Sequence, residues 1–116
     1  MFFESVLAYL NPDIEQIKTN LKNDQNLLSK AIIETNYILN HGFLPLNFIL
    51  KNIKKIENIP TKIIHGRYDA ICSAFDAWNL HKNLKNSTLK FPIAGHSAFD
   101  PNLKIILQKT VLEFVL

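Results

Sequence analysis

Apolar residues in the first part of the chain recur at helical spacing and are interrupted by turn-forming residues. The pattern predicts one helix over about 14–21 and a longer one over about 26–39, with a polar break at 23–24 between them. The turn at 11–13 offers an Asn or Asp that can cap the first of these helices. Gly42 marks the end of the second, because glycine tolerates the left-handed conformation common after a helix.

The pattern changes after Pro60, where short β-branched runs alternate with amphipathic segments. Because strands that alternate with helices pair in parallel, the fold class is α/β. Two parallel strands do not form a stable sheet alone, so we expect the chain to be part of a larger sheet. The predicted elements in order are a helix over 46–56, a strand over 61–65, a helix over 74–84, a strand over 88–92 and a helix over 101–116.

Composition narrows the functional class. The 116 residues fit one small domain or a piece of a larger one. Hydrophobic residues make up 47% and charged residues 20%, which argues against disorder. Thirteen Lys and Arg against ten Asp and Glu give a net charge of only +3, so no nucleic-acid partner is expected.

Segments for export or membrane insertion are not apparent in the sequence. No apolar run approaches the roughly 20 residues that cross a bilayer, so no membrane partner is expected, and the first residues do not resemble a signal peptide. The single cysteine, Cys72, cannot form an internal disulfide, which favours a cytoplasmic location. The four histidines lack metal-ligand spacing, so neither a metal nor another cofactor is expected.

Candidate chemistry lies in the two loops that follow the predicted strands, since functional residues of α/β sheets gather there. Asp69 lies in the first loop and His96 in the second. Alone, each has an ordinary structural interpretation, the Asp as a helix cap and the His as a turn residue. Together, the acid followed by the histidine matches the triad order of α/β-hydrolases, in which the acid orients an imidazole that acts as general base.

Two motifs carry a family resemblance. The segment His65-Gly66-Arg67-Tyr68-Asp69 and the later segment Ala94-Gly95-His96-Ser97-Ala98-Phe99 strongly resemble the C-terminal part of proline iminopeptidases. These α/β-hydrolases remove N-terminal proline from peptides. The similarity continues upstream through the region of residues 31–43. It implies that the chain is the C-terminal part of an α/β-hydrolase fold, with a helical cap-like segment at 1–45 and a core segment at 46–116.

The resemblance also implies roles for individual residues. Asp69 matches the triad acid and His96 the triad histidine. Glu34 matches a cap glutamate that binds the free amino terminus of the substrate. Glu4 resembles the second such glutamate, although Phe3 stands before it where the family has Trp. The implied substrates are peptides with N-terminal proline, whose cationic imino group would hydrogen-bond to the carboxylates.

The nucleophile of this chemistry is absent from the sequence. A nucleophile elbow requires Gly-x-Ser-x-Gly or a close relative, and no serine lies between two glycines at that spacing. We therefore expect no activity from this chain alone and a need for a separately encoded N-terminal segment that supplies the serine. Two alternatives are a non-catalytic truncated remnant or small interaction module, and a hydrolase that uses Cys72 with His96 and Asp69.

The remaining residues of the signature have structural interpretations. Cys72 is expected to be an inert thiol, because no strand-to-helix elbow presents it. Tyr68 and Trp78 are expected to pack rather than to bind substrate. His65 and His81 show no evident proton partner in the sequence and are assigned structural roles.

Overall fold

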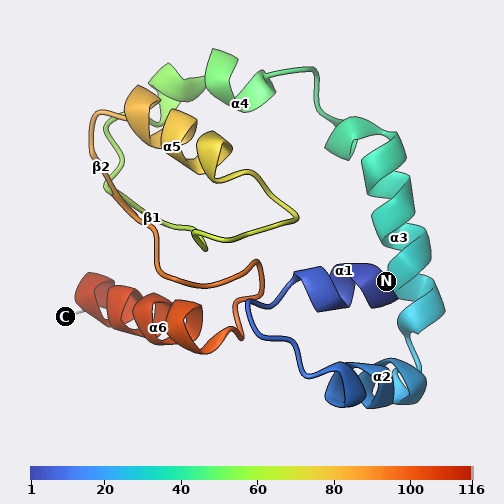
Figure 1. Cartoon of the computed structure of the whole chain (residues 1–116). Helices are drawn as coiled ribbons and strands as arrows, with labels where there is room; N and C mark the ends of the chain where they lie inside the picture. The colour runs from blue at the N-terminus through green and yellow to red at the C-terminus, as the bar shows by residue number, and fades with distance from the viewer. Residues whose placement is uncertain (116) are drawn as a thin grey trace.

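The computed structural model describes residues 1–115 of the chain. Helices form its first half and a two-stranded α/β unit its second (Figure 1). Single 3₁₀ turns lie at His41–Phe43 and Ile53–Lys55. The remaining elements are α1 (Phe2–Leu7), α2 (Ile14–Asn23), α3 (Leu27–Leu39), α4 (Phe48–Lys51), β1 (Thr61–Ile64), α5 (Ala74–Asn83), β2 (Ser87–Lys90) and α6 (Pro101–Val115).

The second half confirms the predicted α/β pattern. Strands β1 and β2 pair in parallel, with Thr61 opposite Ser87 and Ile64 opposite Lys90. Helix α5 connects the strands, and α5 and α6 lie on either side of the pair (Figure 1). His81, at the end of α5, has a hydrogen-bond partner that the sequence did not predict. Its Nδ1 lies 2.8 Å from the Ser87 hydroxyl at the start of β2.

The predicted helix over 46–56 is wrong as a single element. The structure divides it into α4 and the 3₁₀ turn at Ile53–Lys55. Asn52 causes the break, because its side-chain amide donates a 2.8 Å hydrogen bond to the carbonyl of Phe48 and its backbone leaves the helical region. Asn competes with helix in this way because its short side chain hydrogen-bonds to nearby backbone.

The two helices predicted in the first half over about 14–21 and 26–39 are present as α2 and α3, with ends that differ by one or two residues. The Asp13 side chain accepts a 2.9 Å hydrogen bond from the Gln16 amide and caps α2. Gly42 adopts φ +65°, the left-handed conformation expected after α3. Helix α1 was not predicted as a helix, and it packs against α2.

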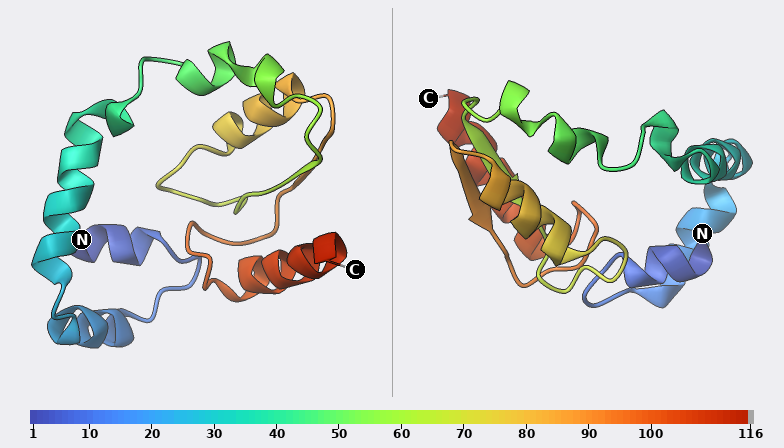
Figure 2. Two further views of the ribbon diagram at one scale, coloured as in Figure 1. Left: turned by 180° about the vertical axis from the view of Figure 1, so that it is seen from behind. Right: turned by 90° about the horizontal axis from the view of Figure 1, so that it is seen from above.

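The molecule is open rather than compact. Its Cα radius of gyration is 16.3 Å, whereas a compact chain of this length has about 13 Å. Its accessible surface is 8822 Å², compared with about 6,500 Å² for a compact protein of the same mass. Figures 1 and 2 show the reason, because α2, α3 and α4 follow one another in an arc around the outside of the molecule and do not pack onto the strands.

Few apolar side chains among the described residues are buried, and many large ones are exposed. No residue of α3 is buried. Exposed apolar area on this scale favours contact with further protein. The buried hydrophobic residues are Ile17, Ile53, Leu84, Ala94 and Leu103. Over residues 1–115, none of the helices has both the length and the apolar character that a membrane span requires.

Backbone pairing continues past the ends of the strands into the two loops. The amides of His65, Arg67 and Tyr68 donate to the carbonyls of Lys90, Pro92 and Ala94, at 3.1, 2.8 and 3.0 Å. Gly66 lies inside this extended contact. A Cβ at that position would lie 1.9 Å from the carbonyl oxygen of Gly95. The absence of a side chain at Gly66 is therefore what lets the loops approach.

We expect Gly66→Ala to destabilise the fold by at least about 1–3 kcal/mol, because the methyl group must push two backbones apart. Urea denaturation followed by circular dichroism measures the loss. Gly42→Asn is the matched control, since nothing lies within 4 Å of its added Cβ and Asn tolerates positive φ. Equal stability of the Gly66→Ala variant and the unsubstituted chain would contradict the close contact.

Candidate functional site

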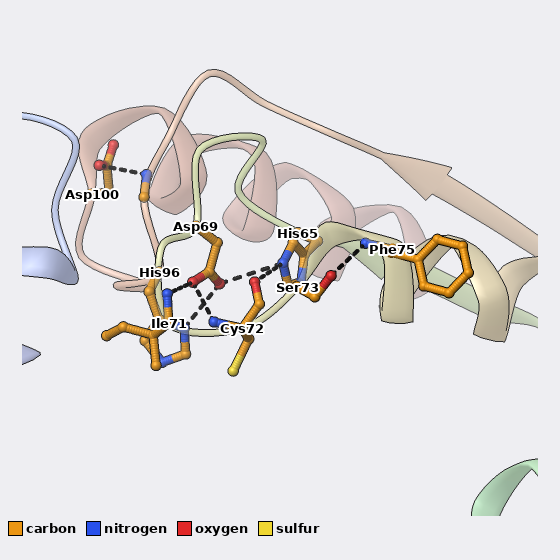
Figure 3. Close-up of polar contacts among 9 residues, drawn as sticks. His65, Asp69, Ile71, Cys72, Ser73, Phe75, His96 and Asp100 are labelled. Carbon is orange, nitrogen blue, oxygen red and sulfur yellow. Dashed lines mark hydrogen bonds and ion pairs between the residues drawn. The ribbon is translucent and has the colours of Figure 1, made fainter. Parts of the chain in front are cut away.

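The extended loop contact brings Asp69 and His96 together, as the sequence predicted. Asp69 lies in the loop after β1 and His96 in the loop after β2. The His96 Nδ1 and the Asp69 Oδ2 are 2.9 Å apart (Figure 3). The Asp69 side chain is only 4% exposed, whereas that of His96 is 40% exposed. The carboxylate is thus enclosed and the imidazole reaches the surface.

The loop backbone prepares Asp69 to remain ionised. Its Oδ1 accepts hydrogen bonds from the amides of Ile71 at 2.9 Å and Cys72 at 2.8 Å. Burial raises the pKa of Asp69, but the hydrogen bonds from Cys72, His96 and Ile71 together outweigh burial and lower the pKa below 3.8. An ionised carboxylate only accepts hydrogen bonds, so His96 must donate from Nδ1. This leaves the Nε2 lone pair of a neutral His96 free to take a proton.

His65 is a second histidine at the same carboxylate. Its Nε2 lies 3.4 Å from the Asp69 Oδ2 and 3.2 Å from the backbone carbonyl of Cys72. No proton partner for His65 was evident from the sequence, because both partners come from the folded loop that follows it. Its position four residues before Asp69, at the end of a strand, was the only available signal.

Asp100 anchors the turn that carries His96, a role that the sequence pattern did not indicate. Its side chain is buried, and Oδ2 accepts hydrogen bonds from the Gly95 amide at 3.0 Å and the Leu10 amide at 3.1 Å. The Ser97 amide also donates to the carbonyl of Ala8 at 2.7 Å. These bonds tie the histidine loop to the end of α1. An aspartate directly before a helix-starting proline resembles an ordinary cap, which is why sequence alone did not single it out.

The two predicted substrate-binding glutamates also meet. Glu4 lies on α1 and Glu34 on α3. A hydrogen bond with Glu4, and then the negative charge of Glu4, raise the pKa of Glu34 above its ordinary value of 4.5. Two carboxyl groups this close favour either a shared proton or a bound cation. The pair therefore presents an acidic feature suited to a cationic group.

Cys72 has the properties of a protonated thiol. Burial raises its pKa above 9.0, and the negative charges of Asp69 and Asp76 raise it further. A nucleophilic cysteine requires the opposite shift. The environment of Cys72 thus opposes the alternative in which it acts as the nucleophile with His96.

The two serines that lie close to Asp69 and His96 in sequence, Ser73 and Ser97, serve the local backbone. The Ser97 Oγ accepts a 3.2 Å hydrogen bond from the Phe99 amide, and the Ser73 Oγ accepts one of 3.2 Å from the Phe75 amide. Both are turn or cap contacts rather than features of a strand-to-helix elbow. The site thus holds an acid and a base, while the sequence contains no nucleophile motif to complete them.

Curated proteins named proline iminopeptidase are similar to this chain. The protein from Arabidopsis thaliana is 40% identical over 103 residues, which are 87% of this chain and 27% of that protein. The one from Xanthomonas citri is 35% identical over 111 residues, 93% of this chain and 35% of its own length. The one from Xylella fastidiosa strain 9a5c is 45% identical over 82 residues, which are 69% of this chain and 26% of that protein.

The chain therefore spans between a quarter and about a third of the length of these relatives. No family model matches it.

The pH response of Asp69 tests the geometry of the pair. The pKa of Asp69 is lowered in the fold. Its ionised form therefore stabilises the protein at pH values above the ordinary pKa of 3.8, and this stabilisation disappears as the pH falls through the lowered pKa. We expect the Asp69 carboxyl carbon to titrate below 3.8 in an NMR pH series. His96→Ala should move the midpoint upward, because one hydrogen bond is lost.

The matched control is His81→Ala, which removes a histidine that bonds to Ser87 instead. It should leave the titration of Asp69 unchanged. A midpoint at or above 3.8 in the unsubstituted protein would contradict the proposed state of the carboxylate.

Proposed function

We propose, from the homology of this chain to a segment of the proline iminopeptidases, which are α/β-hydrolases, that it supplies the acid and the base of a serine aminopeptidase releasing N-terminal proline. The observation that carries the proposal is the 2.9 Å contact between Asp69 and His96. Residues 1–45 would contribute to the cap over the site and residues 46–116 to the hydrolase core.

In this proposal, His96 takes the proton of a serine hydroxyl through Nε2 as the hydroxyl attacks the carbonyl of the N-terminal proline. Asp69 holds the ring in the required tautomer and stabilises the imidazolium that forms. His96 then returns the proton to the leaving amine, and water repeats the sequence to release proline. The exposed edge of His96 and the enclosed carboxylate of Asp69 support this division of roles.

Glu4 and Glu34 would bind the cationic imino group of the substrate. Helix α1 links the glutamate pair to the loop that carries His96. Glu4 lies in α1, and the carbonyl of Ala8, the residue directly after α1, accepts the hydrogen bond from the Ser97 amide. The helical rise over these four residues is about 6 Å. The glutamate pair and the histidine loop are thus joined through one short helix, and this connection supports the proposal that they act on the same substrate.

The serine and the oxyanion donors must come from a segment outside this sequence, on the same or a separate polypeptide. The open arm and exposed apolar residues support this part of the proposal, because a remaining hydrolase core would cover them. The alternative, a non-catalytic truncated remnant, is compatible with the same features. Only a reconstitution experiment separates the two.

The test combines the chain with the portion of the Xanthomonas citri relative that lies outside the aligned region, and follows hydrolysis of a proline arylamide. We expect the mixture to show turnover that neither piece shows alone. Asp69→Asn should lower the turnover number by roughly 10⁴-fold, because the amide favours the wrong tautomer of His96.

Asp76→Asn is the matched control, since it removes an exposed carboxylate from the first turn of α5 without touching His96. It should retain nearly full turnover. Association of the two pieces without hydrolysis would support the non-catalytic alternative and contradict the proposal.

Glu34→Gln tests substrate binding separately from chemistry. We expect KM for the proline arylamide to rise by roughly 10- to 100-fold with a smaller effect on kcat, because a charge-assisted hydrogen bond to the imino group is lost. Glu15→Gln on the exposed side of α2 is the control and should leave KM unchanged. An unchanged KM in Glu34→Gln would remove Glu34 from the substrate site.

A further inference from the structure

A third side chain reaches the Asp69 and His96 pair. Asp69, Cys72 and His96 each offer a metal-ligating atom, and these atoms all lie within 4.8 Å of one another. In Figure 3 the Cys72 sulfur and the His96 ring project to the same side of the Asp69 carboxylate. The residues come from two loops, so their spacing in the sequence did not indicate a metal site.

We propose that Asp69, Cys72 and His96 form a binding site for a thiophilic divalent cation such as Zn²⁺. Carboxylate, thiolate and imidazole are the three side-chain ligands of zinc. Thiolate and imidazole together favour zinc over Mg²⁺ and Ca²⁺, which prefer oxygen ligands. One carboxylate and one thiolate also balance the two positive charges of the ion.

The geometry requires only a small adjustment. Zinc holds its ligand atoms at about 2.0–2.3 Å, which sets tetrahedral ligand atoms roughly 3.3–3.7 Å apart. Ligand atoms that lie up to 4.8 Å apart must therefore approach by at most about 1.1–1.5 Å, which rotation of the exposed Cys72 side chain can provide. The thiol releases its proton to solvent as the sulfur–metal bond forms. The His96 nitrogen that binds the metal must be deprotonated, so the neutral ring carries its single proton on the other nitrogen.

The surroundings of the carboxylate already resemble those of a metal ligand. Metal-bound carboxylates are held by hydrogen bonds from groups behind them. Asp69 Oδ1 has two such bonds, from the amides of Ile71 and Cys72. On the other side, the exposure of His96 and Cys72 leaves room for a fourth ligand from solvent or substrate.

Zinc bound here would occupy His96 and Asp69, so binding and proton transfer by His96 exclude each other. This regulatory consequence rests on the proposed function, whereas the binding of the ion does not. Cys72 would then act as a metal ligand beside a serine-type relay, without taking part in hydrolysis.

Binding is tested on the full chain without any hydrolysis assay. Calorimetric titration with Zn²⁺ should show one site, and Co²⁺ should give a sulfur-to-metal charge-transfer band with the intense visible bands of a tetrahedral complex. Cys72→Ser should abolish the charge-transfer band and weaken Zn²⁺ binding at least about tenfold. His96→Gln should weaken it similarly, and Mg²⁺ should not compete.

His41→Gln is the matched control, since His41 lies in the 3₁₀ turn after α3 rather than in either loop. It should bind Zn²⁺ as the unsubstituted chain does, and circular dichroism verifies that each variant is folded. Unchanged Zn²⁺ affinity in a folded Cys72→Ser variant, or no binding by the unsubstituted chain, would overturn the proposal.

The reconstituted hydrolase tests whether Zn²⁺ binding prevents proton transfer by His96. Zn²⁺ should inhibit it reversibly, with EDTA restoring turnover. Cys72→Ser should keep the basal turnover but need at least about tenfold more Zn²⁺ for inhibition. If reconstitution yields no hydrolysis, the titrations with Zn²⁺ and Co²⁺ still decide the binding site, so failure of the proposed function and failure of the metal site are distinguishable.

Discussion

The close approach of two loop backbones, made possible by Gly66, is the constraint on which the site depends. The parallel ladder of β1 and β2 continues through the amides of Arg67 and Tyr68, so the two loops leave the sheet in register. Asp69 and His96 then lie at the same edge, at hydrogen-bond distance. A side chain at Gly66 would separate the loops without any change to Asp69 or His96 themselves. The geometry of the pair is thus a property of the backbone as much as of its two side chains.

Asp69 and the Glu4–Glu34 pair differ in their electrostatic environment. Asp69 is enclosed and receives hydrogen bonds from amides and an imidazole, which together keep its pKa low despite burial. Glu34 faces Glu4, whose hydrogen bond and charge raise its pKa. The first environment stabilises a permanent negative charge beside a base. The second favours a shared proton or a nearby cation, so the same type of side chain has opposite pKa shifts in the two places.

The open architecture explains why an ordered acid and base can occur in a chain with little core. Local backbone pairing and Asp100 hold the loops, and neither needs the large exposed apolar surface of α3 to be covered. A stable enzyme needs more, because parallel strands require neighbours and a nucleophile must be presented on a strained turn. The same arrangement exposes His96 and Cys72 together, which is the basis of the inferred metal site.

The sequence by itself determined the order of most elements after α1, the parallel pairing and the pairing of Asp69 with His96. These follow from local periodicity, from turn residues such as Asp13 and Gly42, and from the rule that parallel strands present their loops at one edge. It erred where one side chain competes with the helix backbone, at Asn52. Only the tertiary structure decided that His65 joins Asp69, that Asp100 anchors the His96 turn and that Cys72 lies beside both Asp69 and His96. Those contacts depend on how separate loops fold against one another, and such distances are not encoded in the spacing of residues along the chain.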